Sequence, residues 1–134
     1  MYSQSVGWYK VATMERFFFI AGSVSAFLAV LLGAFAAHGL KTRLSPEMFN
    51  IFEVGVRYHI YHALALLAVS WASTRWPNGS VVAAGWLFLA GTVIFSGSLY
   101  LLSLTGMRWL GAITPIGGAA FLLGWLLLAW GVWR

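Results

Sequence analysis

Four long apolar stretches, separated by short polar segments, dominate the pattern along the chain. They cover residues 17–37, 54–72, 81–104 and 110–133, and only the second contains a charged side chain. A helix of 20 residues at about 1.5 Å per residue is as long as the hydrocarbon core of a bilayer is thick. Because lipid leaves an open chain no other way to pair its backbone groups, the pattern predicts four membrane-spanning helices. The first stretch is longer than the apolar region of a signal peptide, so we expect it to be retained as a span.

The connections between these stretches predict how the spans are arranged. Short links at 77–80 and 105–108 favour neighbours that run in opposite directions. The longer first link contains Ser45 and Pro46, which suit the N-cap and first position of a helix. Residues 46–53 therefore predict a short interfacial helix that leads into the second span. The expected fold is all-α, an integral membrane antiparallel four-helix bundle that forms one domain over 1–134, with 1–13 as an extension and Met14 as an alternative start.

Composition narrows the class of protein further. Of 134 residues, 61% are apolar and 8% are charged, whereas a soluble domain carries roughly 25% charged residues. The absence of cysteine excludes disulfides and thiolate metal sites. The eight basic residues are scattered, so the net charge of +5 favours a lipid surface over nucleic acid as the partner. Their distribution slightly favours both termini in the cytoplasm, and most of the tryptophans lie near span ends, as in aromatic belts.

Small residues recur at every fourth position in the first span. The ridge consists of Ala21, Ser25, Ala29, Gly33 and Ala37. Small side chains allow helices to approach closely in lipid, where the hydrophobic effect does not drive association. The favoured interpretation is packing against other spans of the same chain, and the alternative is a face for a second copy or a larger complex. In the last span, Pro115 lacks an N–H group and predicts a helix kink.

Polar side chains collect in one half of the predicted bundle. They are His38, Tyr58, His59, His62, Ser96, Ser98, Tyr100 and Thr114. Polar groups in lipid require partners and face the bundle interior. Three interpretations remain open: a hydrogen-bond network between helices, which we favour, a polar vestibule lined by all of these except His59 and Ser98, and a metal site on the three histidines. In a network, we expect a neutral His62 bonded to Tyr58, Ser96, Tyr100 or Thr114.

The remaining chemistry in the sequence is sparse. Its three carboxylates lie near span ends, and no nucleophile with a base or phosphate-binding loop is present. We therefore expect no catalytic residue, no bound metal and no cofactor. The sequence favours a structural or accessory membrane protein rather than an enzyme. The alternative is a small transporter, or a ligand- or lipid-binding protein that uses the vestibule. A metal-dependent membrane enzyme is the least favoured function.

Four short motifs carry a family resemblance. They are GAFAAHGL at 33–40, YHIYHAL at 58–64, FSGSLY at 95–100 and TPIGG at 114–118. In this order they resemble the YgdD-like family of small bacterial inner-membrane proteins, which is defined only as a domain of unknown function. The resemblance implies four spans in the bacterial inner membrane and transfers no activity. The family usually has Gln at the position of His59, which argues against a three-histidine metal site.

Overall fold

All regular secondary structure is helical in a computed structural model that describes the backbone of residues 2–134 and the side chains of residues 13–134. The long helices are α1 (Tyr2–Phe35), α2 (Pro46–Arg75), α3 (Gly79–Thr105) and α4 (Thr114–Trp133). A π-helical turn, Ala36–Leu40, follows α1, and a 3-10 turn, Arg108–Ala112, precedes α4. The predicted all-α class is therefore confirmed.

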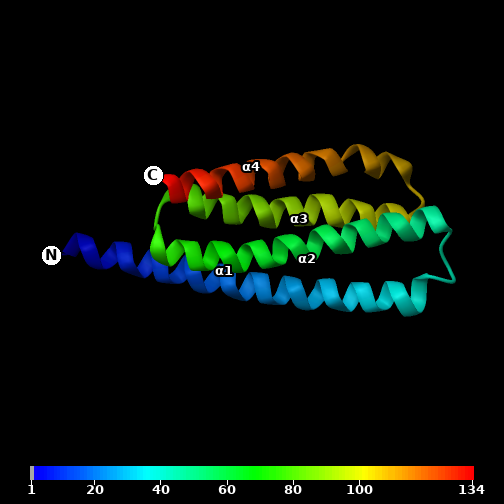
Figure 1. Ribbon diagram of the computed structural model, residues 1–134, viewed down its shortest axis with the longest axis horizontal. Helices are drawn as coiled ribbons and strands as arrows, with labels where there is room; N and C mark the ends of the chain where they lie inside the picture. Colours follow the sequence, from blue (N-terminus) through cyan, green and yellow to red (C-terminus); the bar gives the residue numbers. More distant parts are fainter. Residues whose placement is uncertain (1) are drawn as a thin grey trace.

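The helices pack in the order in which they occur in the chain. Figure 1 shows that consecutive helices run in opposite directions and that the two termini lie at the same end of the molecule. α1 packs against α2, α2 against α3 and α3 against α4, whereas α2 touches α4 only lightly. Within the described residues, α1 and α4 form no packed interface. The pair α2–α3 therefore occupies the middle, with α1 and α4 attached on either side.

The start of α2 agrees with the sequence prediction. The Ser45 hydroxyl accepts a hydrogen bond from the backbone N–H of Met48 at 3.3 Å, and Pro46 occupies the first helical position. The cap satisfies a backbone donor that has no acceptor within the helix. Residues 46–53 continue into the rest of α2 without interruption. The predicted lead-in and second span therefore form one helix.

Asn78 fixes the turn between α2 and α3. Its side-chain oxygen accepts hydrogen bonds from the N–H groups of Ser80 and Val81, at 3.0 and 3.2 Å, and so caps α3. Its amide nitrogen donates to the carbonyl oxygen of Gly131 at 2.7 Å. One side chain thus starts α3 and holds the end of α4 beside it.

The predicted kink at Pro115 is wrong. The last α-helix begins at Thr114, not at 110, so Pro115 lies in its first turn. N–H groups of a first turn have no acceptor within the helix, and a proline at this position removes no helical hydrogen bond. The interruption instead precedes the helix, where the 3-10 turn ends at Ala112.

Three segments of the described chain are long and apolar enough to cross a membrane. They are Thr13–Leu40, Gly79–Thr105 and Arg108–Trp133. α2 is not among them. It carries charged side chains at Glu47, Glu53, Arg57 and Arg75. The predicted count of four spans therefore exceeds what length and hydropathy establish.

The predicted small-residue ridge faces α2 only in part. Ala29 is buried, Ser25 and Gly33 are half-buried, and Ala37 is exposed. In a helix with 3.6 residues per turn, each step of four residues points about 40° away from the direction of the previous one. Over the length of the ridge, this rotation carries Ala37 away from the interface.

Among the described glycines of α1, Gly22 has the tightest contact with α2. A Cβ atom added there would lie 2.9 Å from the carbonyl oxygen of Ala63. A Cβ at Gly33 would lie 3.3 Å from a methyl group of Val56, which is a looser contact. The ridge position that we expected to be critical is therefore less tight than Gly22, its neighbour on the adjacent row.

Aromatic rings rest directly on glycines where α3 meets other helices. A Cβ at Gly91 would lie 2.5 Å from the ring of Phe121, and one at Gly124 would lie 2.7 Å from the ring of Phe88. Similar pairs are Gly85 with Phe18 and Gly55 with Tyr100. Glycine gives room for a ring against the helix backbone, so the helices approach closely.

We expect Gly22→Ala to lower the free energy of unfolding by about 1–3 kcal/mol, because the new methyl group meets backbone that cannot move aside. Gly97→Ala is the matched control, since a Cβ at Gly97 would have no atom within 4 Å. The control should be neutral or raise stability by up to about 1 kcal/mol through helix propensity. Unfolding in detergent micelles, followed by circular dichroism, measures both. Equal stability of the two variants would contradict a tight α1–α2 contact at Gly22.

Candidate functional site: two buried histidines and their partners

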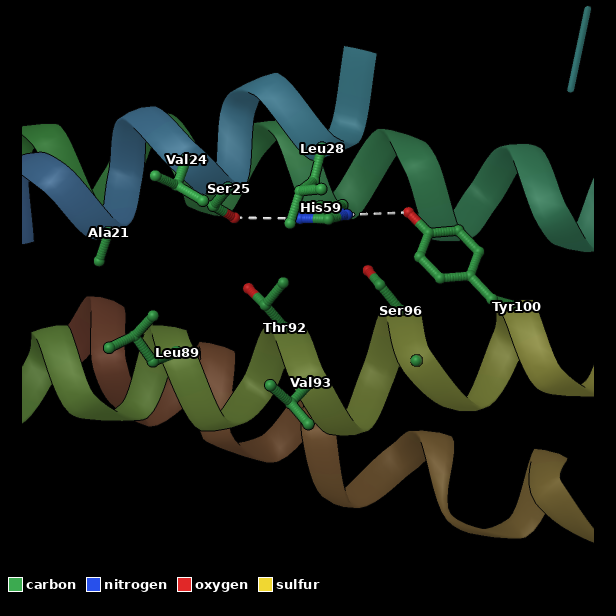
Figure 2. A pocket seen from close by; sticks show the side chains of 11 residues that line it. Ala21, Val24, Ser25, Leu28, His59, Leu89, Thr92, Val93, Ser96 and Tyr100 are labelled. Atoms are coloured by element: carbon green, nitrogen blue, oxygen red, sulfur yellow. Dashed lines mark hydrogen bonds between the residues drawn. The ribbon is translucent and has the colours of Figure 1, made fainter. Parts of the chain in front are cut away.

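His59 joins three helices. Its ring lies in the middle of α2, where Nε2 is 3.0 Å from the hydroxyl oxygen of Ser25 on α1. Nδ1 is 3.0 Å from the hydroxyl oxygen of Tyr100 on α3. Figure 2 shows this chain of three side chains, with Thr92 and Ser96 projecting toward the same space from α3. The ring is 8% exposed, so these two hydroxyls are its main polar surroundings.

Gly55 allows Tyr100 to reach His59. A Cβ atom at Gly55 would lie 2.8 Å from the Tyr100 ring, so only glycine lets that ring lie flat against α2. The Gly55 carbonyl also accepts a hydrogen bond from the Ser96 hydroxyl at 2.8 Å. Close backbone approach and the polar contacts of His59 therefore depend on the same glycine.

His62 has a defined protonation state. Its Nδ1 atom lies 2.8 Å from the backbone oxygen of Tyr58, and the indole N–H of Trp125 donates to Nε2 at 3.2 Å. A carbonyl oxygen only accepts a hydrogen bond, and an indole N–H only donates one. The ring is therefore neutral, with its proton on Nδ1. Its face stacks on Phe121, with ring centroids 3.4 Å apart and an angle of 6° between the planes.

His62 thus has one donating and one accepting nitrogen, as the network interpretation expects, but its partners differ from the predicted ones. Tyr58 contributes its backbone oxygen rather than its hydroxyl, and Trp125 was not among the expected partners. Sequence reasoning assigned the tryptophans to aromatic belts near span ends. Trp125 instead lies in the interior of α4, where its indole N–H is the group that reaches α2.

Serine and threonine hydroxyls connect the remaining helix pairs. The hydroxyl oxygens of Ser98 and Thr114 lie 2.7 Å apart and join α3 to α4. Ser70 on α2 donates to the backbone oxygen of Glu15 on α1 at 2.8 Å. In the part of the chain that the structure describes, every buried side-chain nitrogen or oxygen has a hydrogen-bond partner.

The predicted polar cluster divides among separate interfaces. His59 faces α1 and α3, His62 faces α4, and His38 lies exposed in the π-helical turn. Residues three apart on a helix differ by about 60° in direction, which is enough to send His59 and His62 to different neighbours. The six residues of the predicted vestibule therefore do not surround one cavity. Among the described side chains, no group of three His, Cys, Asp or Glu residues is placed to hold a metal ion.

Two grooves adjoin the histidines. The α1–α3 groove has a volume of about 390 Å³ and contains His59, Ser25, Thr92, Ser96 and Tyr100 between walls of Val24, Leu28, Leu89 and Val93. The α2–α4 groove has a volume of about 510 Å³, and aromatic rings dominate its lining, which includes Tyr58, His62, Phe95, Phe121 and Trp125. A smaller hollow of about 220 Å³ lies between α1 and α2, beside Glu53 and Arg57.

Comparison with known proteins places this helical chain with membrane proteins. Residues 32–118 match the family described as "Protein of unknown function (DUF423)", and the chain belongs to that family. The UPF0382 membrane protein YwdK of Bacillus subtilis is 48% identical over 114 residues, which cover 84% of this chain and 93% of the relative. No solved structure matches the chain.

Two staphylococcal relatives extend the comparison. The UPF0382 membrane protein SSP2132 of Staphylococcus saprophyticus is 45% identical over 119 residues, which cover 89% of this chain and 98% of the relative. A UPF0382 membrane protein of Staphylococcus epidermidis is 49% identical over 113 residues, with coverage of 84% and 92%. The chain is therefore a membrane protein of a family whose function is unknown, and the family assigns it no catalytic activity.

We expect His62→Leu to lower the free energy of unfolding by about 1–3 kcal/mol, because the Trp125 N–H, in a part-buried and apolar contact, loses its acceptor. Trp125→Phe in the same chain removes that unsatisfied donor and should recover part of the loss, which a double-mutant cycle measures in detergent. Strictly additive losses would contradict a direct interaction between the two side chains.

Proposed function

We propose that the chain crosses the bacterial inner membrane four times as an antiparallel bundle, with both termini in the cytoplasm, and that its family is the YgdD-like group. The fourth crossing is α2. Glu47, Glu53 and Arg75 lie toward its ends, Arg57 follows Glu53 by about one turn, and residues 58–74 carry no charge. α2 also packs against α1 and α3, which both contain candidate spans. A helix held between two spans shares their environment.

The distribution of side chains around α2 supports this placement. The residues that it exposes along the uncharged segment include Tyr61, Leu64 and Trp71, which suit contact with lipid. The polar rings of His59 and His62 point instead into the protein. Polar groups inside and apolar groups outside are the arrangement that a hydrocarbon solvent requires. Its low hydropathy therefore reflects polar residues that the other helices cover.

For the biological role, we propose a structural or accessory component of the membrane without its own catalytic activity. The observation that carries this proposal is that both nitrogens of both buried histidines bond to groups of the chain itself. A histidine that serves in catalysis or ion transport needs a nitrogen that substrate or water can reach. These two rings instead act as connectors between helices.

We further propose that the chain associates with itself or with a larger membrane complex through α1. This helix contacts α2 on one side and leaves much of its surface uncovered, including Ala34 and Ala37. Small exposed residues allow another helix to approach closely. The lipid bilayer is the other partner of this surface.

Reporter fusions test whether α2 crosses the membrane. We expect a fluorescent protein fused after Pro77 or at the C-terminus to fluoresce, because it remains in the cytoplasm. Alkaline phosphatase fused after Arg43 or after Gly106 should be active outside. If the fusions after Arg43 and after Pro77 report the same side of the membrane, α2 does not cross it, which would contradict four crossings.

Gentle extraction tests the accessory role. We expect native mass spectrometry to recover the wild-type chain as an oligomer or with a stoichiometric partner. Ala34→Trp should release a single chain with unchanged helix content, because the large ring blocks close approach. Leu122→Trp is the matched control on α4, where Leu122 is 71% exposed, and it should behave as wild type. A wild-type chain that stays monomeric and alone in native lipid would contradict association.

A further inference from the structure

The α1–α3 groove contains a hydrogen-bond donor that the chain does not use. A neutral imidazole has one N–H group and one lone pair. Of the Ser25 and Tyr100 hydroxyls, one donates its proton to the lone pair of His59. The other accepts the N–H of His59, so its own proton is not used in that bond. Among the described residues, neither Ser25 nor Tyr100 has another side-chain hydrogen bond. One of these two hydroxyl protons is therefore without an acceptor in either tautomer of His59.

The other hydroxyls of the groove add no second unused donor, because each already donates its proton to a backbone oxygen. Thr92 donates to the backbone oxygen of Phe88, and Ser96 donates to that of Gly55, both at 2.8 Å. The groove thus presents a single unused O–H donor. An O–H group without a partner in an apolar setting costs free energy, so a bound acceptor there is favoured.

The depth of the groove limits what can supply the acceptor. Thr92 lies at the midpoint of α3, and Ser25 lies near the middle of the candidate span Thr13–Leu40. The middle of a hydrocarbon core about 30 Å thick is about 15 Å from the polar headgroups, beyond the reach of the ester carbonyls of an ordinary phospholipid. The acceptor therefore belongs to a molecule that dissolves in the membrane interior.

The walls of the groove define the rest of this molecule. Val24 and Leu28 of α1 face Leu89 and Val93 of α3 across the opening, as Figure 2 shows. The volume of about 390 Å³ exceeds that of a few waters, which occupy about 30 Å³ each, and apolar cavities tend to stay dry. An aliphatic body fits these walls better than water does.

We propose that the α1–α3 groove binds a membrane-soluble carbonyl compound. Its carbonyl oxygen accepts the unused proton of Ser25 or Tyr100, and its aliphatic body lies between Val24, Leu28, Leu89 and Val93. A quinone with a long tail and a fatty acyl ester share this chemistry. The site goes beyond the structural role proposed above and requires only that α1 and α3 face lipid.

Photolabelling with 4-decylbenzophenone tests the site. This probe has one ketone acceptor and one alkyl tail, and under ultraviolet light it inserts into nearby C–H bonds. In nanodiscs of phosphatidylethanolamine and phosphatidylglycerol, we expect labels on the α1 and α3 residues that line the groove. Decylbenzoquinone or methyl decanoate should compete, and decane at equal concentration should compete less. Stronger competition by the quinone assigns a quinone source, and stronger competition by methyl decanoate assigns an acyl ester. Labels elsewhere, or equal protection by decane, would overturn the proposal.

Paired variants separate the free hydroxyl from general stability. We expect Ser25→Ala/Tyr100→Phe to weaken competition by decylbenzoquinone about fivefold, as loss of one hydrogen bond predicts. The control Ser98→Ala/Thr114→Val removes two hydroxyls from the α3–α4 contact and should leave competition unchanged. Gly97 lines the groove, and an added Cβ there has no atom within 4 Å, so Gly97→Phe should place its ring in the groove and abolish labelling there. Undiminished groove labelling of Gly97→Phe would overturn the site even if the hydroxyl variant fails to fold.

Discussion

A buried polar group in a membrane protein must find its partner within the protein, and this constraint governs how the four helices are joined. Lipid is as apolar as a leucine side chain, so helix association there depends on close packing and hydrogen bonds. His59 connects α1, α2 and α3 through two hydroxyls, and His62 connects α2 to α4 through an indole. The bond from His62 matters most for α4, because α2 and α4 otherwise touch only lightly.

Close packing and hydrogen bonding support one another at Gly55. The missing side chain admits the ring of Tyr100, and the exposed backbone carbonyl accepts the hydroxyl proton of Ser96. Phe52, one turn earlier on α2, packs against the same ring with centroids 4.8 Å apart. The position of the Tyr100 hydroxyl, and therefore its bond to His59, follows from apolar contacts on both sides of the ring. A small residue thus acts on polar chemistry as well as on helix spacing.

The sequence predicts the helical class and several helix ends because these depend on local features. The uncharged stretches predict long helices, and Ser45 with Pro46 predicts the start of α2. The arrangement of the histidines is less accessible, because it depends on the direction in which each side chain leaves its helix. The sequence pattern places His38, His59 and His62 in the same half of the bundle, yet the three side chains have different surroundings. Trp125 was missed as a partner since an indole near a span end and an indole within an interface have the same local signature. The prediction for Pro115 failed because a proline one turn into an apolar stretch also suits the first turn of a helix.

Helices that are neighbours in the chain are also neighbours in space, and this has a consequence for biosynthesis. Each main interface forms between helices that are consecutive in the chain. Each helix can dock on its predecessor as it leaves the ribosome, but His62 of α2 meets the indole of Trp125 only after α4 has been made. Until then the Nε2 atom of His62 lacks this partner, so the last helix completes the polar contacts of the second.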